Sequence, residues 1–375
     1  MTETLWLLIE PADVWLFRDA RPFSPAEGGF AQSRFPPLPA TVAGALRTYI
    51  GHALYDGSFA NLGTADTSPI RFLGPLIVEN PDSPTVYVPA PADLLRPPDR
   101  KDAAVRLEPR SWPNWVDAAP QPPSSVLFWT AYLDKAEPLT GWITWADFWA
   151  WQNGKTLSSA VIRRASDFYE FEARPGIRMD SSRNVVHPQG GAFYWVNYVR
   201  LRLGIALLVG LQRWTWPESE WSKLVEHFQS TPEATLRLGG ERRLAFLRRA
   251  PESVTEELAR LAKVVVASDS LGLWLLTPAV VEDPSQIPFY IGPRDAPSTA
   301  RIQALVRASG PSVHVGWDYV RNAPKPPRRL LPAGSVLVLQ ADQPISGTGW
   351  MAVGDMPTLG YGWAVPFPFA TPSPH

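Results

Sequence analysis

The chain has 375 residues, of which 45% are hydrophobic, and a formal net charge of −1 at pH 7, so it is long enough for two domains of roughly 100 to 200 residues each. The near-zero charge excludes non-specific attraction to nucleic acid as the main source of binding, and the lack of cysteine excludes disulfides and thiolate metal ligands. The five histidines show no ligand spacing, and no apolar run reaches the roughly 18 residues of a membrane span, so we expect a soluble cytoplasmic protein without metal or cofactor.

The first elements predict a strand and a helix joined by a basic loop. Residues 5–9 and 14–17 are apolar on both faces, as in a central strand. A helix is expected from an N-cap at Thr41 to residue 54, because its apolar residues recur at helical spacing. Gly44 lies beside this apolar stripe and predicts a close approach of the helix to the sheet.

The middle of the chain predicts less regular structure. Residues 89–125 are rich in proline and charge and indicate a long irregular connection or an inserted arm. Residues 142–151 predict a short tryptophan-rich turn or helix. The 17 tryptophans leave two interpretations open, a base-stacking surface or packing in the core and under long loops.

A second unit is expected to begin at Gly190 and Gly191, with a helix at residues 218–228. The strand-like runs of the chain are residues 70–78, 85–88, 126–133, 192–210, 235–238, 272–281, 312–315 and 335–340. Both halves follow the order strand, helix, strand, strand. The economical architecture is an α+β fold with two ferredoxin-like (RRM-like) domains in tandem. We place these at residues 1–189, with an irregular insertion at about 89–185, and at residues 190–375.

An ordered set of motifs carries a family resemblance. In chain order they are Phe17–Phe23, Glu27–Gly28, Phe35–Arg47, Arg174–Ile177 with Asp180, Leu238–Arg243, Lys325–Arg329 leading into Pro332–Val336, and Leu359–Gly362. Together they resemble the third Cmr subunit of type III-B CRISPR effector complexes, within the repeat-associated mysterious protein (RAMP) superfamily. Ala20 and the segment after Asp180 depart from the pattern of that family.

The resemblance implies a non-catalytic, RNA-binding subunit of a ribonucleoprotein that acts in antiviral defence. It implies binding to the repeat-derived 5′ tag of the guide RNA. It also implies docking to the large polymerase-like subunit and contact with the adjacent backbone RAMP subunit.

Binding an RNA tag requires neutralised phosphates and a reader for splayed bases. Glycine loops let backbone N–H groups approach an anion, and Tyr361 between two glycines is expected to stack on a base. The expected RNA-binding residues are Arg18, Arg21, Arg34, Arg47, Arg174, Arg178, Arg242, Arg243, Lys325, Arg328, Arg329, Gly360, Tyr361 and Gly362.

Each of these assignments has a plainer alternative. Six lysines leave 29 arginines among the 35 basic residues, which suits phosphate contacts but equally fits a GC-rich genome. The arginines of the first loop are as consistent with surface salt bridges to Asp19 and Glu27, and the run around Arg242 with a solvated face. The Gly360–Gly362 loop also fits an ordinary turn beside the last strand.

Two other functions stay open. A metal-independent endoribonuclease of the same superfamily would need a general acid or base, for which His187 in a loop is the candidate. A purely protein-binding bridge would make the RNA contacts incidental.

Overall fold

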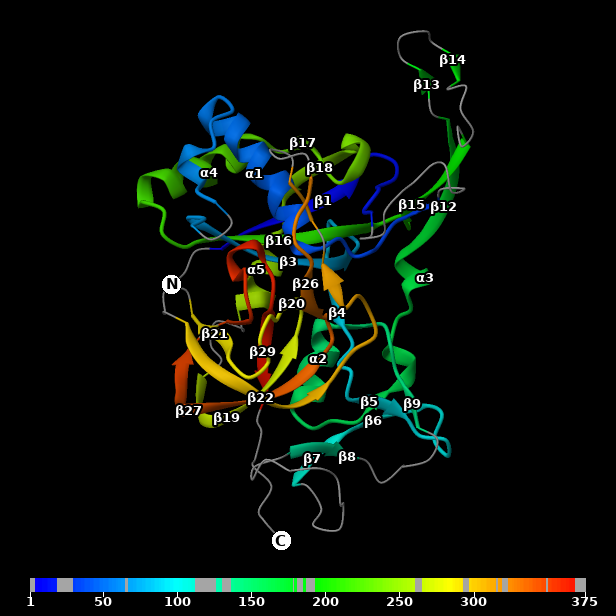
Figure 1. Ribbon diagram of the computed structural model, residues 1–375, viewed down its shortest axis with the longest axis vertical. Coiled ribbons are helices and arrows are strands. Elements are labelled where there is room, and N and C mark those ends of the chain that lie inside the picture. Colours follow the sequence, from blue (N-terminus) through cyan, green and yellow to red (C-terminus); the bar gives the residue numbers. More distant parts are fainter. Residues whose placement is uncertain are drawn as a thin grey trace.

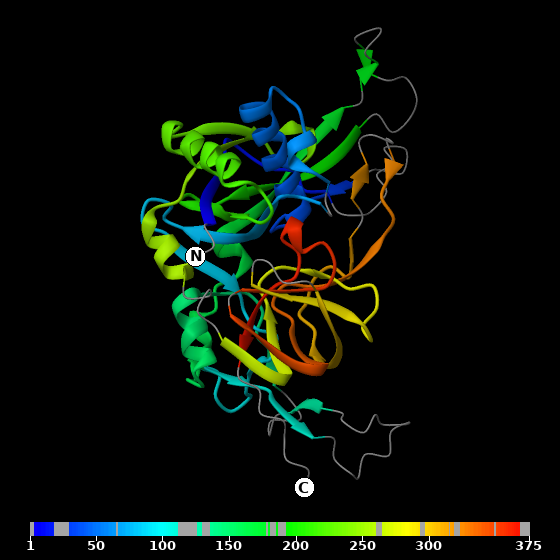
Figure 2. The ribbon, with the colours of Figure 1, turned by 90° about the vertical axis from the view of Figure 1, so that its left-hand side faces the viewer.

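The computed structural model describes residues 4–18, 30–64, 67–111, 126–129, 136–177, 179–180, 185–186, 193–259, 265–292, 297–314, 316–318, 323–348 and 350–367. The fold is a sheet-rich α+β arrangement in which a seven-stranded sheet lies against a closed barrel (Figure 1). From the side, a long two-stranded arm projects away from these two bodies (Figure 2).

The seven-stranded sheet has the order β10-β4-β3-β16-β1-β18-β17, and all of its neighbouring strands are antiparallel. Of the predicted central strand, residues 5–9 are confirmed in β1 (Thr4–Pro11), which lies between β16 (Ile205–Arg213) and β18 (Leu244–Arg249). Residues 14–17 lie beyond the end of β1, and Trp15 forms an isolated bridge with Val199. The other strands of this sheet are β3 (Ile70–Glu79), β4 (Thr85–Pro89), β10 (Trp142–Thr144) and β17 (Ala234–Arg237).

Two helices cover one face of this sheet. Helix α1 (Pro39–Tyr55) starts three residues before the expected position, because Leu38 and not Thr41 is the N-cap and Pro39 takes the first turn, where its missing N–H costs no hydrogen bond. Helix α4 (Glu218–Ser230) confirms the helix expected at residues 218–228. Both pack on Leu5, Leu7 and Ile9 of β1. Gly44 has no atom within 4 Å of an added Cβ, so the expected close approach of α1 at this residue is wrong.

The opposite face of the sheet packs against the barrel. Trp6 and Leu8 of β1 join a second core with α2 (Trp145–Gln152), α5 (Glu252–Leu258) and barrel residues such as Trp274 and Trp363. The alternation of side chains along β1 therefore divides its residues between two cores. Trp145 and Trp151 are buried here, which favours the core interpretation of the tryptophan-rich middle.

The sheet crosses the domain boundary expected after residue 189. Strands β16 and β18 follow that boundary, yet both pair with β1. Residues 80–204, between β3 and β16 in the chain, form an insertion that contributes β4 and β10 to the edge of the main sheet. Within it, the connection expected to be irregular contains short strands. The elements of the insertion outside the main sheet are β5 (Leu94–Arg96), β6 (Ala103–Arg106), β7 (Glu108–Ser111), β8 (Val126–Trp129), β9 (Glu137–Pro138), β11 (Leu157–Ser158), α2, η3 (Ser159–Val161), α3 (Ala165–Phe168), β12 (Tyr169–Ile177), β13 (Met179–Asp180), β14 (Val185–Val186) and β15 (Phe193–Leu201).

The barrel occupies the C-terminal part of the chain. It closes in the order β19 (Val265–Leu275), β27 (Val336–Thr348), β22 (Ser298–Val306), β21 (Ile287–Ile291), β28 (Met351–Val353) and β29 (Trp363–Phe367). The smaller elements beside it are β20 (Ala279–Val280), β23 (Val313–His314), β24 (Trp317–Asp318), β25 (Ala323–Pro324), β26 (Arg328–Leu331) and η6 (Pro357–Leu359). A second ferredoxin-like unit is not confirmed, since the described residues after α5 contain no α-helix.

The arm is an extended antiparallel pair of β12 and β15, to which β2 (Phe30–Gln32) adds a parallel third strand. Its inner face packs Tyr198 and Val196 on Val14 and Leu16, the apolar residues that follow β1. We call β12, β15 and β2 the arm sheet.

Candidate functional site

A cleft of about 1200 Å³ lies where the main sheet, the insertion and the barrel meet. Its walls include the segment before α1, the loop around α3 and the barrel loops near Pro278 and Gly310. Its charged lining residues are Arg34, Arg96, Arg163, Arg164 and Arg307, opposed by Asp167. Five guanidinium groups against one carboxylate make the cleft an anion-attracting site.

Two of these arginines are fixed by acidic partners. Arg163 donates from Nε to Asp167 Oδ2 at 3.1 Å and from Nη1 to the Tyr87 hydroxyl at 3.1 Å. Burial alone would lower the pKa of Arg163, but its bonds to Asp167 and to Glu79 raise it. Arg96 forms an ion pair with Glu137 at 3.6 Å. The main role of these two arginines is therefore to hold the wall of the cleft together, because their charges are balanced by carboxylates.

Two others present their charge differently. Arg307 donates to the backbone carbonyls of Ala308 at 3.4 Å and Gly310 at 3.2 Å, which orient the guanidinium without neutralising it. Arg164 is exposed and directly precedes α3, where its backbone N–H donates to Asp167 at 2.9 Å. Sequence reasoning missed all four of these arginines except for their contribution to the general arginine bias; the doublet Arg163-Arg164 is the one local signal that could have drawn attention.

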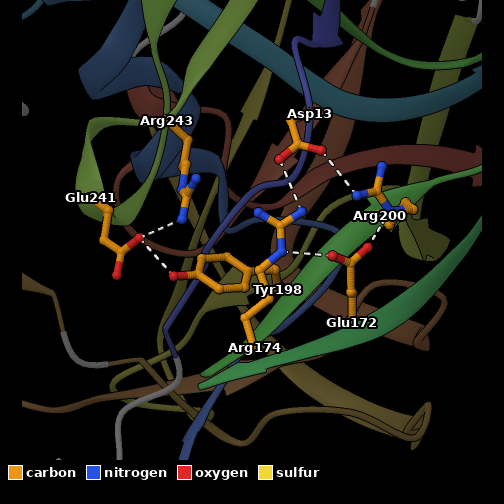
Figure 3. Close-up of polar contacts among 7 residues, drawn as sticks. All are labelled: Asp13, Glu172, Arg174, Tyr198, Arg200, Glu241 and Arg243. Carbon is orange, nitrogen blue, oxygen red and sulfur yellow. Dashed lines mark hydrogen bonds and ion pairs between the residues drawn. The ribbon is translucent and has the colours of Figure 1, made fainter. Parts of the chain in front are cut away.

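Arg174 and Arg243, both expected from the sequence, meet at Tyr198 of the arm sheet (Figure 3). The Arg174 guanidinium carbon lies 5.4 Å from the Tyr198 ring centre and that of Arg243 lies 4.5 Å from it. Glu241 accepts hydrogen bonds of 2.7 Å from the Tyr198 hydroxyl and from Arg243 Nη2. The cation of Arg243 is thus balanced by a carboxylate.

Arg174 is likewise part of an ion-pair network. It donates to Asp13 at 3.0 Å and to Glu172 at 2.6 Å, and Arg200 also bonds to both carboxylates (Figure 3). Burial alone would raise the pKa of Asp13, but the two arginines lower it; they lower the pKa of Glu172 as well. Two cations facing two anions give no net charge, so the salt-bridge alternative describes Arg174 better than a phosphate contact.

The turn that follows β17 is strained. Glu241 and Arg242 have φ of 56° and 50°, in the left-handed region that favours glycine. The turn packs closely, since a Cβ on Gly239 would lie 2.5 Å from the carbonyl oxygen of Leu16. Glu241 is held by its two hydrogen bonds, whereas the neighbouring Arg242 is exposed. Of the residues expected in this motif, Arg242 is the one placed to meet a ligand.

The arginines of the first motif divide between two roles. Arg47 donates to the backbone carbonyls of Gly63 and Thr64, and burial lowers its pKa, so it fastens a loop to α1. Arg34 lines the cleft, while the exposed Arg18 forms an isolated β-bridge with Ser33 through its backbone. Two further expected residues, Arg21 and Arg178, lie outside the described residues.

The C-terminal glycine loop is in the core. Tyr361 has an exposed fraction of 0%, so it offers no ring face for a base, and the expected stacking is wrong for this structure. Gly360 and Gly362 have φ of 91° and 67°, and a Cβ on Gly362 would lie 1.8 Å from the carbonyl oxygen of Val353. The Thr277 hydroxyl donates to the Gly360 carbonyl at 2.7 Å. The loop is the tight turn that the alternative interpretation described.

The last basic motif leads into β26. Arg328 pairs with Glu282 at 3.1 Å, and Lys325 and Arg329 are exposed. Burial raises the pKa of Tyr361, and the charges of Arg34 and Arg328 act in the opposite direction. These two cations, from motifs almost 300 residues apart in the chain, therefore act on the same buried tyrosine.

Within the part of the chain that the structure describes, no group of three histidine, aspartate or glutamate side chains could hold a metal ion. No helix among the described residues is long and apolar enough to span a membrane. His187 lies outside the described residues.

The fold and the cleft define a mixed α+β protein with an arginine-lined, anion-attracting site. Residues 7–365 match the family described as CRISPR-associated protein (Cas_Cmr3). The chain belongs to this Cmr family of CRISPR-associated proteins, as its motifs predicted.

Chains of type III CRISPR complexes are among the solved structures similar to this one. A chain of the cryo-EM structure of the type III-B Cmr-beta complex bound to cognate target RNA is 14% identical, with a TM-score of 0.47, over 89% of this chain and 86% of that one. A chain of the crystal structure of the Csm3-Csm4 subcomplex of a type III-A interference complex is 10% identical, with a TM-score of 0.42, over 99% of this chain and 100% of that one. No curated protein matches the sequence.

Proposed function

We propose that this chain is a non-catalytic subunit of a type III-B CRISPR effector complex that binds the 5′ tag of the guide RNA. In this proposal it docks to the large polymerase-like subunit and to the adjacent backbone RAMP subunit, in the cytoplasm. The observation that carries the proposal is the cleft, whose lining holds five arginines, of which Arg96 and Arg163 are paired with carboxylates, and a single acidic residue, Asp167. Membership of the Cmr family supplies the RNA-guided context.

The chemistry of the cleft suits a single-stranded RNA end. Arg164 and Arg307 would contact phosphates, because neither side chain forms an ion pair with a carboxylate among the described residues. Trp142 and the proline pair Pro36-Pro37 line the same cleft and offer flat apolar surface to bases. Arg242, on its strained turn, would extend the contact outside the cleft.

The topology fits one ferredoxin-like unit. The strand order β3-β16-β1-β18, with α1 and α4 on one face, is the order that such a unit requires. We propose that its hairpin between β3 and β16 carries residues 80–204 as an insertion. That insertion forms one wall of the cleft.

Binding of guide RNA with and without the 5′ tag tests the proposal, using the isolated chain and the chain with the large subunit. We expect tighter binding of tagged RNA. An Arg164→Ala/Arg307→Ala variant should weaken it and reduce the slope of log affinity against log salt by about 1.4, since each phosphate contact on a single strand contributes about 0.7. An Arg237→Ala/Arg249→Ala variant, which removes two exposed arginines outside the cleft lining, is the matched control.

Two results would contradict the proposal. One is equal affinity for tagged and untagged RNA in both settings. The other is an Arg164→Ala/Arg307→Ala variant with the affinity and salt slope of the parent.

The non-catalytic assignment is tested separately. Repeat RNA incubated with the protein in EDTA should stay intact. Cleavage that His187→Ala abolishes would instead establish the endoribonuclease.

A further inference from the structure

The arm sheet exposes a broad apolar face. Directly paired residues of neighbouring strands point to the same side of a sheet, and Trp195 pairs with Pro175 on β12 and with Phe30 on β2. Ile177 and Phe193 form the next pair, so they lie on that face too. The exposed fractions of its large side chains are 53% for Phe30, 43% for Phe171, 46% for Ile177, 66% for Phe193 and 51% for Trp195.

The size of this face is that of the largest apolar patch on a typical monomer. Taking about 200 Å² for each aromatic side chain, the exposed fractions of the four rings amount to roughly 400 Å² of apolar surface. The largest apolar patch of a typical monomer is about 300 to 600 Å² and is often functional. One side of a standard protein interface is about 800 Å², so the four rings alone supply roughly half of it.

Charge is segregated between the two faces of the arm sheet. Every charged residue of its three strands, namely Glu170, Glu172, Arg174 and Arg200, alternates onto the opposite face, where they engage in ion pairs. The residues of the apolar face are Tyr169, Phe171, Ala173, Pro175 and Ile177 of β12, Phe193, Trp195, Asn197, Val199 and Leu201 of β15, and Phe30 and Gln32 of β2. None of them carries a charge.

This segregation distinguishes between two kinds of partner. A surface for single-stranded RNA combines stacking rings with cations along the backbone path, and its affinity falls with salt. An uncharged face is complementary to an uncharged apolar surface, which a folded protein supplies. The patch also begins beside the cleft, because Tyr169 packs on the cleft residue Phe35 with ring centres 4.7 Å apart.

We propose that this face of the arm sheet docks an uncharged, apolar surface of another protein subunit of the same complex, next to the RNA-binding cleft. The inference rests on the proposed function in assuming a multisubunit complex. It specifies which surface of this chain takes part in docking and which chemistry the partner's surface has. The rings of Phe193 and Trp195, which expose the largest areas, are the expected anchors.

The test uses a Phe30→Ser/Phe193→Ser/Trp195→Ser variant of the full chain. Leu203→Ser is the matched control, since Leu203 is a fully exposed apolar residue in the turn between β15 and β16. The other subunits of the effector, separately purified and added one at a time, are the probes. Association is measured at low and at high salt, and tagged guide RNA is titrated into the same preparations. A single Trp195→Lys variant repeats the measurement with the smallest change, in case the triple variant misfolds.

We expect the triple variant to bind one protein subunit about 30-fold or more weakly, as hot-spot truncations do. This association should persist at high salt in the parent, and RNA affinity should be unchanged. Unaltered association of every subunit with the variant would overturn the proposal, as would a loss of RNA affinity with protein association intact. Self-association of the parent that the variant abolishes would instead assign the face to a second copy. If tagged and untagged RNA bind equally well but the triple variant still loses its protein partner, the RNA proposal is overturned and the docking proposal stands.

Discussion

Replacing Gly362 by alanine separates a structural role of the C-terminal turn from an RNA-binding role. The residue has φ of 67°, a region that costs an L-residue about 1 to 2 kcal/mol. The new methyl group would also start 1.8 Å from the carbonyl oxygen of Val353, so β28 or the turn has to move; such overpacking costs about 1 to 3 kcal/mol. We therefore expect the free energy of unfolding to fall by about 2 to 5 kcal/mol, a large part of the stability of a typical domain.

Urea denaturation of the parent and the variant measures this loss. Gly154→Ala is the control, because Gly154 has φ of 75° but no atom within 4 Å of the added Cβ, so it isolates the backbone cost. The Gly362→Ala variant should lose at least about 1 kcal/mol more than Gly154→Ala and keep the affinity of its folded fraction for tagged RNA. Unchanged stability with a tenfold loss of RNA affinity would refute the structural reasoning and restore the loop as a binding site.

Three further predictions concern residues whose surroundings the structure defines. Gly44→Ala should raise the free energy of unfolding by about 0.5 to 1 kcal/mol, measured by urea denaturation, because the position is an unobstructed helix interior; a loss of stability would contradict it. Arg47→Ala should lower the free energy of unfolding by about 1 to 3 kcal/mol, because two hydrogen bonds to carbonyls are lost. Its RNA affinity should be unchanged. Weaker RNA binding without loss of stability would show that Arg47 binds RNA and does not fasten the loop. Burial raises the pKa of Asp93 to about 6, and Arg106 offsets only part of this, so the folded state binds the proton more tightly than the unfolded chain. The free energy of unfolding of the parent should then rise by about 3 kcal/mol relative to that of Asp93→Asn as the pH falls from 7 to below 4. Parallel curves of stability against pH for the two proteins would disprove this.

Local patterns predicted β1, β3, β4, β16 and β17 of the main sheet, but they missed β10 and β18 and did not show how the strands are joined. The apolar residues of β1 and the helical spacing of α4 depend on short stretches, and both are confirmed. The pairing of β3 with β16 connects Glu79 to Ile205, which lie far apart in the sequence. The periodicity within β3 or β16 does not identify the other strand as its partner. The division at residue 189 therefore separated strands that the fold brings together.

The same limit applies to the candidate site. An arginine in a glycine-containing sequence can donate to phosphate, carboxylate or backbone carbonyl with the same guanidinium geometry. Arg47, Arg174 and Arg34 resemble each other in the sequence, and tertiary packing gives them a carbonyl cage, an ion-pair network and a place in the cleft. The sequence resemblance was specific enough for the family, because the order of many short motifs is rarely reproduced by chance. It was less informative about individual residues, because each motif serves packing as well as binding.

The insertion between β3 and β16 explains why the two surfaces lie side by side. Its α3 region contributes Arg163 and Arg164 to the cleft, and the chain then passes directly into β12 of the arm sheet. Arg163 is tied back to Glu79 at the end of β3, so the cleft wall and the base of the arm are fixed to the main sheet at the point where the insertion leaves it. Weakening that anchor should alter both surfaces together, whereas the charge changes at Arg307 on the barrel side should alter RNA affinity alone.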